Sequence, residues 1–213
     1  IKQVPGSESP LSIDSSEQIL DESQIAYVVN ECDNYAIEEA LKICDQSGQG
    51  EVVIVSMGPE RVQKVIREAL AKGAHRGIHV VTNSTEPTDP LTTASALANA
   101  LKEEGFDLIL SGLQSDDMGY GQTGVILGEM LNMSTATLAM STEVSNDTIK
   151  VKRELEAGYF QWVKMSLPAS ISVQSGCNTP RYPSLKGIMG AKKKEIAQIN
   201  FDSASTHQAI KKL

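Results

Sequence analysis

A glycine-rich stretch at residues 112–124 has the residue types and spacing best suited to chemistry in this chain. It reads GLQSDDMGYGQTG, and its last six residues, beginning at Gly119, match the pattern G-x-G-x-x-G. Glycines before a helix leave backbone N–H groups free to face a phosphate, and the helix dipole adds to that attraction. We therefore expect an anion site here, with an ordinary glycine-rich turn as the alternative.

A second candidate lies at Asn30, Glu31, Cys32 and Asp33, at the start of a predicted helix. Asp33 would cap that helix, which would leave Asn30 free to bond an adenine or ribose edge. Met57 ends a predicted strand, where its soft side chain could pack on a base or simply in the core. These residues fall at the carboxyl edge of the expected sheet, where open α/β sheets bind ligands.

Catalytic motifs of hydrolases and transferases do not occur in the sequence, which has no nucleophile elbow, P-loop or H-E-x-x-H. His75 and His79 flank a predicted turn, and we interpret them as surface or packing residues rather than a general base. Cys32, Cys44 and Cys177 form no C-x-x-C pair, which favours a reducing compartment and argues against disulfides and a structural zinc.

Residues 180–194, PRYPSLKGIMGAKKK, combine two prolines, an apolar cluster and a run of lysines. Proline fixes the backbone, so Leu185 would be presented to a partner with little loss of conformational entropy. This composition predicts a docking segment. The alternative is that Leu185 folds back into the core of its own domain.

The elements that must position these residues alternate between strand and helix. Short apolar runs predict parallel strands buried on both faces, and amphipathic segments that stop at glycines predict helices. Strands are expected at residues 51–57, around the apolar run 52–55, and at 78–82 and 108–110, and helices at 33–44, 59–72, 90–104 and 123–131. The order, with a polar loop at 83–89, predicts an α/β fold with a doubly wound parallel sheet.

The apolar period changes after residue 135. The segments 148–156, 159–165 and 169–173 predict an antiparallel β-hairpin extension, with turns at Asn146-Asp147 and Ala157-Gly158. We expect this extension to span about residues 143–174 and to lead into the docking segment.

Composition sets the broad class. The chain has 213 residues, of which 40% are hydrophobic and 22% charged, which suffices for one α/β core. The net charge of −8 would repel a phosphate backbone, so we expect no nucleic-acid partner. No run approaches the ~18 apolar residues of a membrane span, so we expect an intracellular protein without membrane insertion.

Several motifs together resemble the β subunit of the electron transfer flavoproteins, and the resemblance covers nearly the whole chain. They are IKQVP at the start, NECDNYAIEEAL from Asn30, GAHRGIH from Gly73, QTG from Gln122, LPA from Leu167, NTPRYPSL from Asn178, IM at Ile188 and AKKK from Ala191.

The resemblance implies a non-enzymatic electron carrier of an adenine nucleotide α-hydrolase-like fold, which pairs with an FAD-carrying α subunit and holds AMP structurally. It implies electron transfer from acyl-CoA-type dehydrogenases of fatty acid β-oxidation to the respiratory chain, through the flavoprotein's quinone oxidoreductase. The location would be cytoplasmic in a bacterium and the mitochondrial matrix in a eukaryote. By similarity, AMP contacts fall on Asn30, Glu31, Cys32, Asp33, Met57, Gly112, Leu113, Gln114, Ser115, Asp116, Asp117, Met118, Gly119, Tyr120, Gly121, Gln122 and Thr123.

Partner docking, by the same similarity, falls on Pro180, Arg181, Tyr182, Leu185, Ile188 and Met189, with Leu185 in a hydrophobic pocket of the dehydrogenase. The implied domain covers residues 1–194, including a recognition loop at about 178–194, and 195–213 would begin a longer tail. Where family members often carry aromatics, this chain has Cys32 and, close to the flavin, Ser7. The sequence at its start looks like the end of a strand, so we expect part of a longer chain.

Three alternatives stay open at this point. A bifurcating member of the same family would hold a second FAD in place of AMP. An NAD-dependent oxidoreductase would follow from the literal G-x-G-x-x-G, although the pattern lies in the last predicted βα unit rather than the first. A nucleotide-sensing module without a partner is the third.

Overall fold

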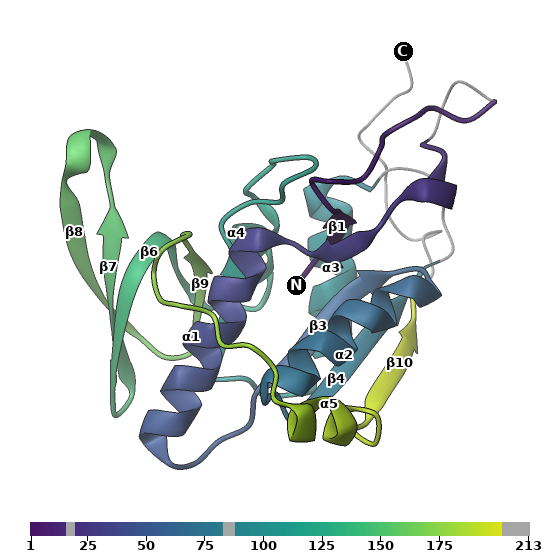
Figure 1. Ribbon diagram of the computed structural model, residues 1–213. Coiled ribbons are helices and arrows are strands. Elements are labelled where there is room, and N and C mark those ends of the chain that lie inside the picture. Colours follow the sequence, from purple (N-terminus) through teal and green to yellow (C-terminus); the bar gives the residue numbers. More distant parts are fainter. Residues whose placement is uncertain (16–19, 83–87, 202–213) are drawn as a thin grey trace.

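The computed structural model describes residues 1–15, 20–82 and 88–201, and helices cover both faces of its parallel strands (Figure 1). The helices are α1 (Glu31–Ser47), α2 (Gln63–Lys72), α3 (Pro90–Leu101), α4 (Thr123–Met130) and α5 (Leu185–Ala191), with 3-10 turns at Glu22–Gln24, Glu60–Val62 and Glu156–Gly158. The strands are β1 (Gln3–Pro5), β2 (Tyr27–Val29), β3 (Val53–Gly58), β4 (Arg76–Val81), β5 (Leu108–Gly112), β6 (Ser134–Ser145), β7 (Thr148–Glu154), β8 (Phe160–Ser166), β9 (Ala169–Val173) and β10 (Ile196–Asn200).

The parallel strands form two ladders rather than one continuous ladder. One has the order β10-β4-β3, and the other has the order β5-β9-β6 and continues into the antiparallel strands β7 and β8. The facing edges β3 and β5 border a cavity of about 1550 Å³. Ile1 lies beside β3, because its ammonium donates to the Val55 carbonyl at 2.8 Å. Strands β1 and β2 form a separate antiparallel pair.

Helices on both faces make the arrangement doubly wound, as the alternating pattern predicts. Helices α1, α2 and α5 lie on one side, and α3 and α4 pack against each other on the other side. Buried apolar residues of α2, including Val65, Ile66 and Leu70, pack with residues of α1 and β3 in one core cluster. The predicted polar loop at 83–89 lies outside the described residues at 83–87.

Strand β9 corrects one prediction from the sequence. Residues 169–173 were expected in the antiparallel extension, but β9 pairs in parallel with both β5 and β6. All five of its residues are buried, as is usual for a parallel strand covered on both faces. The true antiparallel part is β6-β7-β8, with positive φ at Asn146, Ala157 and Gly158 in its turns, as predicted.

The ends of α1 and α2 fall at the predicted glycines, but the start of α1 differs from the prediction. Helix α1 ends at Gly48 in the left-handed conformation (φ 66°), and α2 ends at Gly73 (φ 135°). The cap position of α1 lies three residues earlier than predicted, at Asn30 rather than at Asp33. Helix α3 ends at Leu101 rather than at residue 104.

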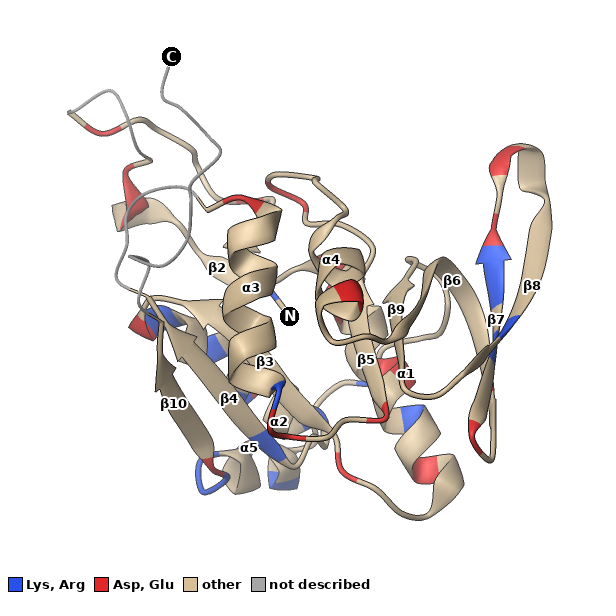
Figure 2. Ribbon diagram, turned by 180° about the vertical axis from the view of Figure 1, so that it is seen from behind, with Lys and Arg blue, Asp and Glu red and all other residues tan. Residues whose placement is uncertain are grey.

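Charged residues occur at both ends of the parallel strands. Figure 2 shows the basic turn between α5 and β10 at one end, and acidic residues in the loops beside α3 and α4 at the opposite end. The first end belongs to the predicted docking segment and the second to the glycine-rich loop. Helix α1 runs between the two ends, and the segment before α5 crosses it (Figure 1).

Candidate functional site

Asp33 joins three segments at the carboxyl end of β5. Its side chain is buried, with one oxygen accepting from the Gly112 amide at 2.7 Å and the other from the Lys2 amide at 2.7 Å. The predicted helix cap at Asp33 is therefore wrong, because this carboxylate bonds to distant backbone rather than to its own helix. A Cβ at Gly112 would lie 2.8 Å from the Asp33 amide nitrogen, so this close approach requires glycine.

Asn30 holds the glycine-rich loop from inside. Its amide nitrogen donates to the Gln114 carbonyl at 2.9 Å, and its amide oxygen accepts from the Asp116 amide at 2.8 Å. The side chain is only 1% exposed. The prediction that Asn30 is free to bond an adenine or ribose edge is wrong for this reason, and its contribution is to shape the loop.

Two aspartates of the loop are bound within the protein. Asp116 accepts from the Glu31 amide at 3.0 Å, and Asp117 forms an ion pair with the Lys2 ammonium at 2.6 Å. Burial raises the pKa of Asp117, but hydrogen bonds from Lys2 and Ser115 outweigh it, so the net pKa is lowered. Lys2 thus neutralises one acidic charge beside the loop, a role that the sequence did not reveal.

The backbone of the loop is turned by glycines. Gly119 and Gly121 have φ values of 64° and 63°, a region that favours glycine. Gln122 precedes α4 without a side-chain capping bond, so the N–H groups of the first turn of α4 have no side-chain acceptor there. A Cβ at Gly124 would collide with the Ser111 hydroxyl, so this third glycine serves close packing of α4 on β5.

The cavity between β3 and β5 runs along both strands, and most of the predicted nucleotide residues line it. Its wall includes Asn30, Asp33, Met57, Gly112, Leu113, Gln114, Ser115, Asp117, Met118, Tyr120, Gly121, Gln122 and Thr123. Four predicted residues are not in that wall, namely Glu31, Cys32, Asp116 and Gly119. The thiol of Cys32 instead lies 3.3 Å from the Ser175 hydroxyl, within hydrogen-bond distance.

The predicted docking residues are mostly exposed. Tyr182 is 94% exposed, Leu185 78% and Met189 60%, and Ile188 is partly exposed. The alternative in which Leu185 packs in its own core is therefore wrong. Arg181 behaves differently, since its guanidinium binds Glu38 of α1, and Pro180 is half-buried.

The two histidines have structural contacts, as predicted. His79 is fully buried in β4, with Nε2 2.8 Å from the Gly58 carbonyl oxygen. His75 accepts from the Val52 amide at 3.0 Å. Within the described residues, no group of three His, Cys, Asp or Glu side chains is arranged to hold a metal ion. No helix in the described part of the chain has the length and apolar character of a membrane span.

Sequence reasoning missed the buried carboxylates Glu38 and Glu39, which are 6% and 2% exposed. The predicted helix did not signal this, because successive helix residues are about 100° apart, which puts Glu38 beside and Glu39 opposite the apolar stripe of Ile37, Leu41 and Cys44. Charged residues in such a position are rarely fully buried unless they are paired. Apart from Lys42, three residues after Glu39, the partners in β6 and in the predicted docking segment could not be read from the sequence, because they lie more than a hundred residues away.

Comparisons with known proteins point to one family. Residues 18–204 match the family described as the electron transfer flavoprotein domain. A relative from Methylophilus methylotrophus, named electron transfer flavoprotein subunit beta, is 36% identical over 203 residues, which cover 94% of this chain and 77% of the relative. Relatives of the same name from Bradyrhizobium diazoefficiens and Bacillus subtilis are 42% and 34% identical, covering 80% and 83% of this chain and 67% and 68% of their own lengths.

Proposed function

This chain belongs to the family of electron transfer flavoprotein β subunits, and from that premise we propose that it is a structural, AMP-binding half of a heterodimeric electron carrier. The observation that carries the proposal is the position of the glycine-rich loop. The loop connects the carboxyl end of β5 to the first residue of α4 and lines part of the cavity. An adenine nucleotide α-hydrolase-like fold for residues 1–194 is part of the same proposal.

The site suits a phosphate held by backbone amides. Gly121 has a positive φ, and a Cβ there would lie 3.4 Å from the Leu113 carbonyl oxygen, so glycine suits the point where the loop folds back on its own start. The first turn of α4 supplies N–H groups and the positive end of the helix dipole. The loop contains no Lys-Ser/Thr pair of the kind that holds Mg²⁺ with phosphates, so we expect a nucleotide bound without metal.

Residues of the site would divide their roles. Amides of Gly121, Gln122 and Thr123 would hold the phosphate, and Met57 on the facing strand would pack on the base. Asn30 and Asp33 would fix the loop from beneath, since their side chains already bond to it. The flavin that accepts electrons would be an FAD held mainly by the α subunit, and AMP would supply no redox chemistry.

Electron delivery would use the exposed apolar residues of the predicted docking segment. We propose acyl-CoA-type dehydrogenases as donors to the FAD of the heterodimer, and the quinone oxidoreductase of this flavoprotein as acceptor. Support comes from the exposure of Tyr182, Leu185 and Met189, because large apolar side chains gathered on a surface are typical of interaction sites. The location would be the cytoplasm in a bacterium or the mitochondrial matrix in a eukaryote.

Nucleotide content tests the proposal directly. The heterodimer is purified with its α subunit, extracted with acid, and the supernatant is separated by chromatography. We expect one FAD and one AMP per heterodimer, because only one of the two nucleotide sites is proposed to carry out redox chemistry. Two FAD per heterodimer would identify a bifurcating member, and bound NAD would overturn the proposal.

Substitution of Leu185 tests the docking half of the proposal. Burial of a leucine side chain in a partner pocket contributes about 1.5–3 kcal/mol, and each ~1.4 kcal/mol is a factor of ten. Leu185→Ala should therefore slow electron transfer from an acyl-CoA dehydrogenase roughly tenfold, while flavin content and melting temperature stay unchanged. Leu91→Ala, an exposed leucine of α3, is the control. Unchanged transfer with a lower melting temperature would contradict docking at Leu185.

A further inference from the structure

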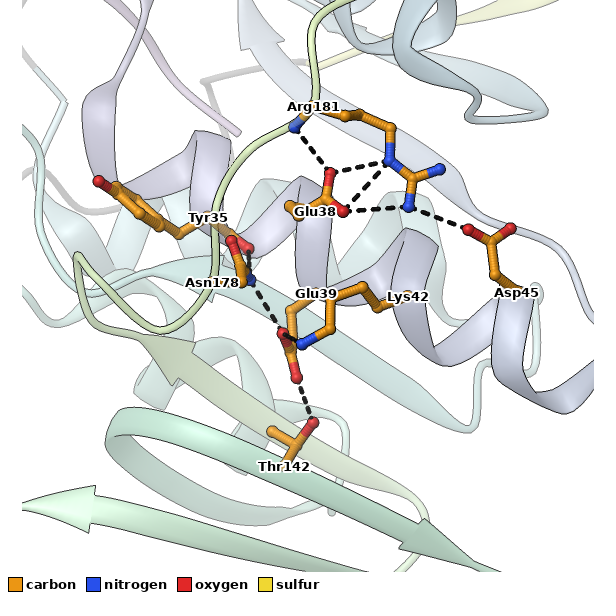
Figure 3. A network of polar contacts seen from close by, with 8 residues as sticks. All are labelled: Tyr35, Glu38, Glu39, Lys42, Asp45, Thr142, Asn178 and Arg181. Carbon is orange, nitrogen blue, oxygen red and sulfur yellow. Dashed lines mark hydrogen bonds and ion pairs between the residues drawn. The ribbon is translucent and has the colours of Figure 1, made fainter.

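The docking segment, residues 178–194, is anchored to α1 through a buried carboxylate. Glu38 is 6% exposed and accepts from the Arg181 backbone amide at 3.0 Å. The Arg181 guanidinium reaches the same carboxylate through Nε at 2.9 Å and through a terminal nitrogen at 3.0 Å (Figure 3). One carboxylate therefore fixes both the backbone and the side chain of Arg181, the residue directly before exposed Tyr182.

Glu39 holds the beginning of the segment in the same way. Its carboxylate accepts from the Asn178 amide nitrogen at 2.9 Å, the Thr142 hydroxyl at 2.6 Å and the Lys42 ammonium at 3.0 Å (Figure 3). Asn178 also donates to the Tyr35 carbonyl at 3.0 Å. Because Thr142 belongs to β6, Glu39 ties the docking segment, α1 and the second ladder together.

Helix α2 holds the other end of the segment. Arg67 donates to the carbonyls of Ala191 and Lys194, and the Lys194 ammonium donates to the carbonyls of Leu70 and Ala74. Between these two anchored ends stand the exposed side chains that we call the docking row, Tyr182, Leu185, Ile188 and Met189. The row is thus carried on a segment whose ends are fixed by side chains of α1 and α2.

We propose that Glu38 and Glu39 are positioning residues for the docking row, an inference that rests on the proposed docking function. Neither carboxylate is exposed enough to touch a partner, so both act through Arg181 and Asn178. A buried ion pair is often no more stabilising than well-packed apolar residues of the same volume would be, and a fixed geometry is one of the reasons for which such pairs are retained. Here that geometry presents Leu185 to the dehydrogenase.

The physical effect is preorganisation. A partner that binds only one arrangement of the segment has its affinity reduced by the fraction of molecules in that arrangement. If loss of the Glu38 contacts leaves about a tenth of the molecules in the docking arrangement, the apparent affinity for the dehydrogenase falls about tenfold. Chemistry at the flavin stays the same once the complex forms, so KM changes and kcat does not.

The test uses the complete heterodimer with an acyl-CoA dehydrogenase, reduced by its acyl-CoA substrate, as electron donor. Glu38→Gln keeps the shape of the side chain but places an amide N–H against the guanidinium. We expect KM for the heterodimer to rise about tenfold with kcat, AMP and FAD unchanged. Amides of α5 should exchange hydrogen faster, while those of α1 should not. Glu39→Gln should act in the same direction.

Asp45→Asn is the matched control. Asp45 also binds the Arg181 guanidinium, at 2.9 Å, but its side chain is 62% exposed. Exposed ion pairs contribute little, so we expect its KM to equal that of the native heterodimer. Arg181→Lys provides a second variant that keeps a cation beside Glu38 but loses the forked geometry, and its KM should also rise.

Combination with Leu185→Ala separates positioning from a general structural role. If Glu38 acts by placing Leu185, the double variant Glu38→Gln/Leu185→Ala should be little worse than Leu185→Ala alone. The positioning role would be overturned if the effects of Glu38→Gln and Leu185→Ala on KM were fully additive, or if Glu38→Gln and Arg181→Lys both had the native KM. Neither result would contradict docking through Leu185. A native KM for Leu185→Ala would instead remove the docking function itself.

Discussion

Asp33 accounts for much of the local order at the proposed nucleotide site, because its buried carboxylate accepts from two backbone N–H groups of other segments. It accepts from Gly112 at the end of β5 and from Lys2 near the chain start. A buried backbone N–H without an acceptor is costly, so this arrangement fixes where the loop leaves β5. The Asn30 side chain fixes the next part of the loop, because it forms hydrogen bonds with the backbone of Gln114 and Asp116.

Gly121 provides the clearest test at the residue scale. Gly121→Val would place a β-branched side chain at a positive φ, which costs on the order of 1–3 kcal/mol and crowds the approach to the loop. We expect loss of AMP from the purified heterodimer, measured by acid extraction.

Gly48→Val is the matched control for Gly121→Val. Gly48 ends α1 with φ 66° and has no heavy atom within 4 Å of an added Cβ. The Gly48→Val heterodimer should have a melting temperature lowered by a similar amount and should keep its AMP. Retention of stoichiometric AMP by Gly121→Val would place the nucleotide elsewhere.

Individual residues were predictable where their role is local. The glycines of the loop and the exposed leucine after two prolines could be recognised, since turns and stiff segments depend on neighbouring residues. Asp33 was misassigned as a helix cap because its true partner, Gly112, lies 79 residues away in the sequence. Capping is the common role for aspartate before a helix, and tertiary contact overrides it here.

At the scale of elements, α5 depends on an unusually close contact with α2. A Cβ at Gly187 would collide with the Ala71 carbonyl oxygen, whereas one at Gly190 would meet nothing within 4 Å. Both glycines lie in the same short helix, which is capped by the Ser184 side chain accepting from the Gly187 amide. Only one of them is therefore needed for packing.

Alanine substitutions at these two glycines should have opposite effects. Gly187→Ala should push α5 away from α2, lower the melting temperature and weaken transfer from the dehydrogenase. Gly190→Ala should leave transfer intact and raise stability, since alanine favours a helix over glycine by about 1 kcal/mol. Calorimetry and transfer kinetics measure both, and equal effects of the two variants would argue against close packing at Gly187.

Elements with strong periodicity were predicted well, and those defined by pairing were not. Apolar stripes and glycine ends located α1, α2, α3 and α4 to within a few residues. Strand β9 was placed in the antiparallel extension, although its uninterrupted burial is typical of a parallel strand. Register and neighbour choice depend on distant segments, which a local pattern does not specify.

For the whole molecule, the two proposed sites lie at opposite ends of the parallel strands, and α1 spans the distance between them. Its first turn bonds to the glycine-rich loop, and its middle holds the docking segment through Glu38 and Glu39. The sequence indicated both sites separately. Their link through α1 could not be predicted, because it depends on burial of two glutamates against residues far away in the chain.

Stability of the whole chain should fall in acid partly through Glu39. Burial raises the pKa of Glu39, but hydrogen bonds from Thr142, Asn178 and Lys42 outweigh it, so the folded pKa lies below 4.5. The folded state then binds fewer protons than the unfolded state just below pH 4.5. This contribution is complete above that pH and is lost as pH falls through the folded pKa.

Urea unfolding between pH 7 and pH 3 measures this acid dependence. Glu39→Gln should be less stable at pH 7 and should lose less stability on acidification than the native chain. Glu143→Gln removes one charge at an exposed position and serves as control. An acid slope for Glu39→Gln as steep as the native slope would contradict the assignment.

The contacts of Lys194 also bear on how this molecule responds to ionic strength. Its ammonium is committed to the carbonyls of Leu70 and Ala74, whereas Lys192 and Lys193 are exposed. Dissolved salt screens exposed charges over about 10 Å at 0.1 M, which slows the approach of an oppositely charged protein. The attraction due to Lys192 and Lys193 should therefore weaken as salt is added, whereas the part-buried contacts of Lys194 with the end of α2 should change less.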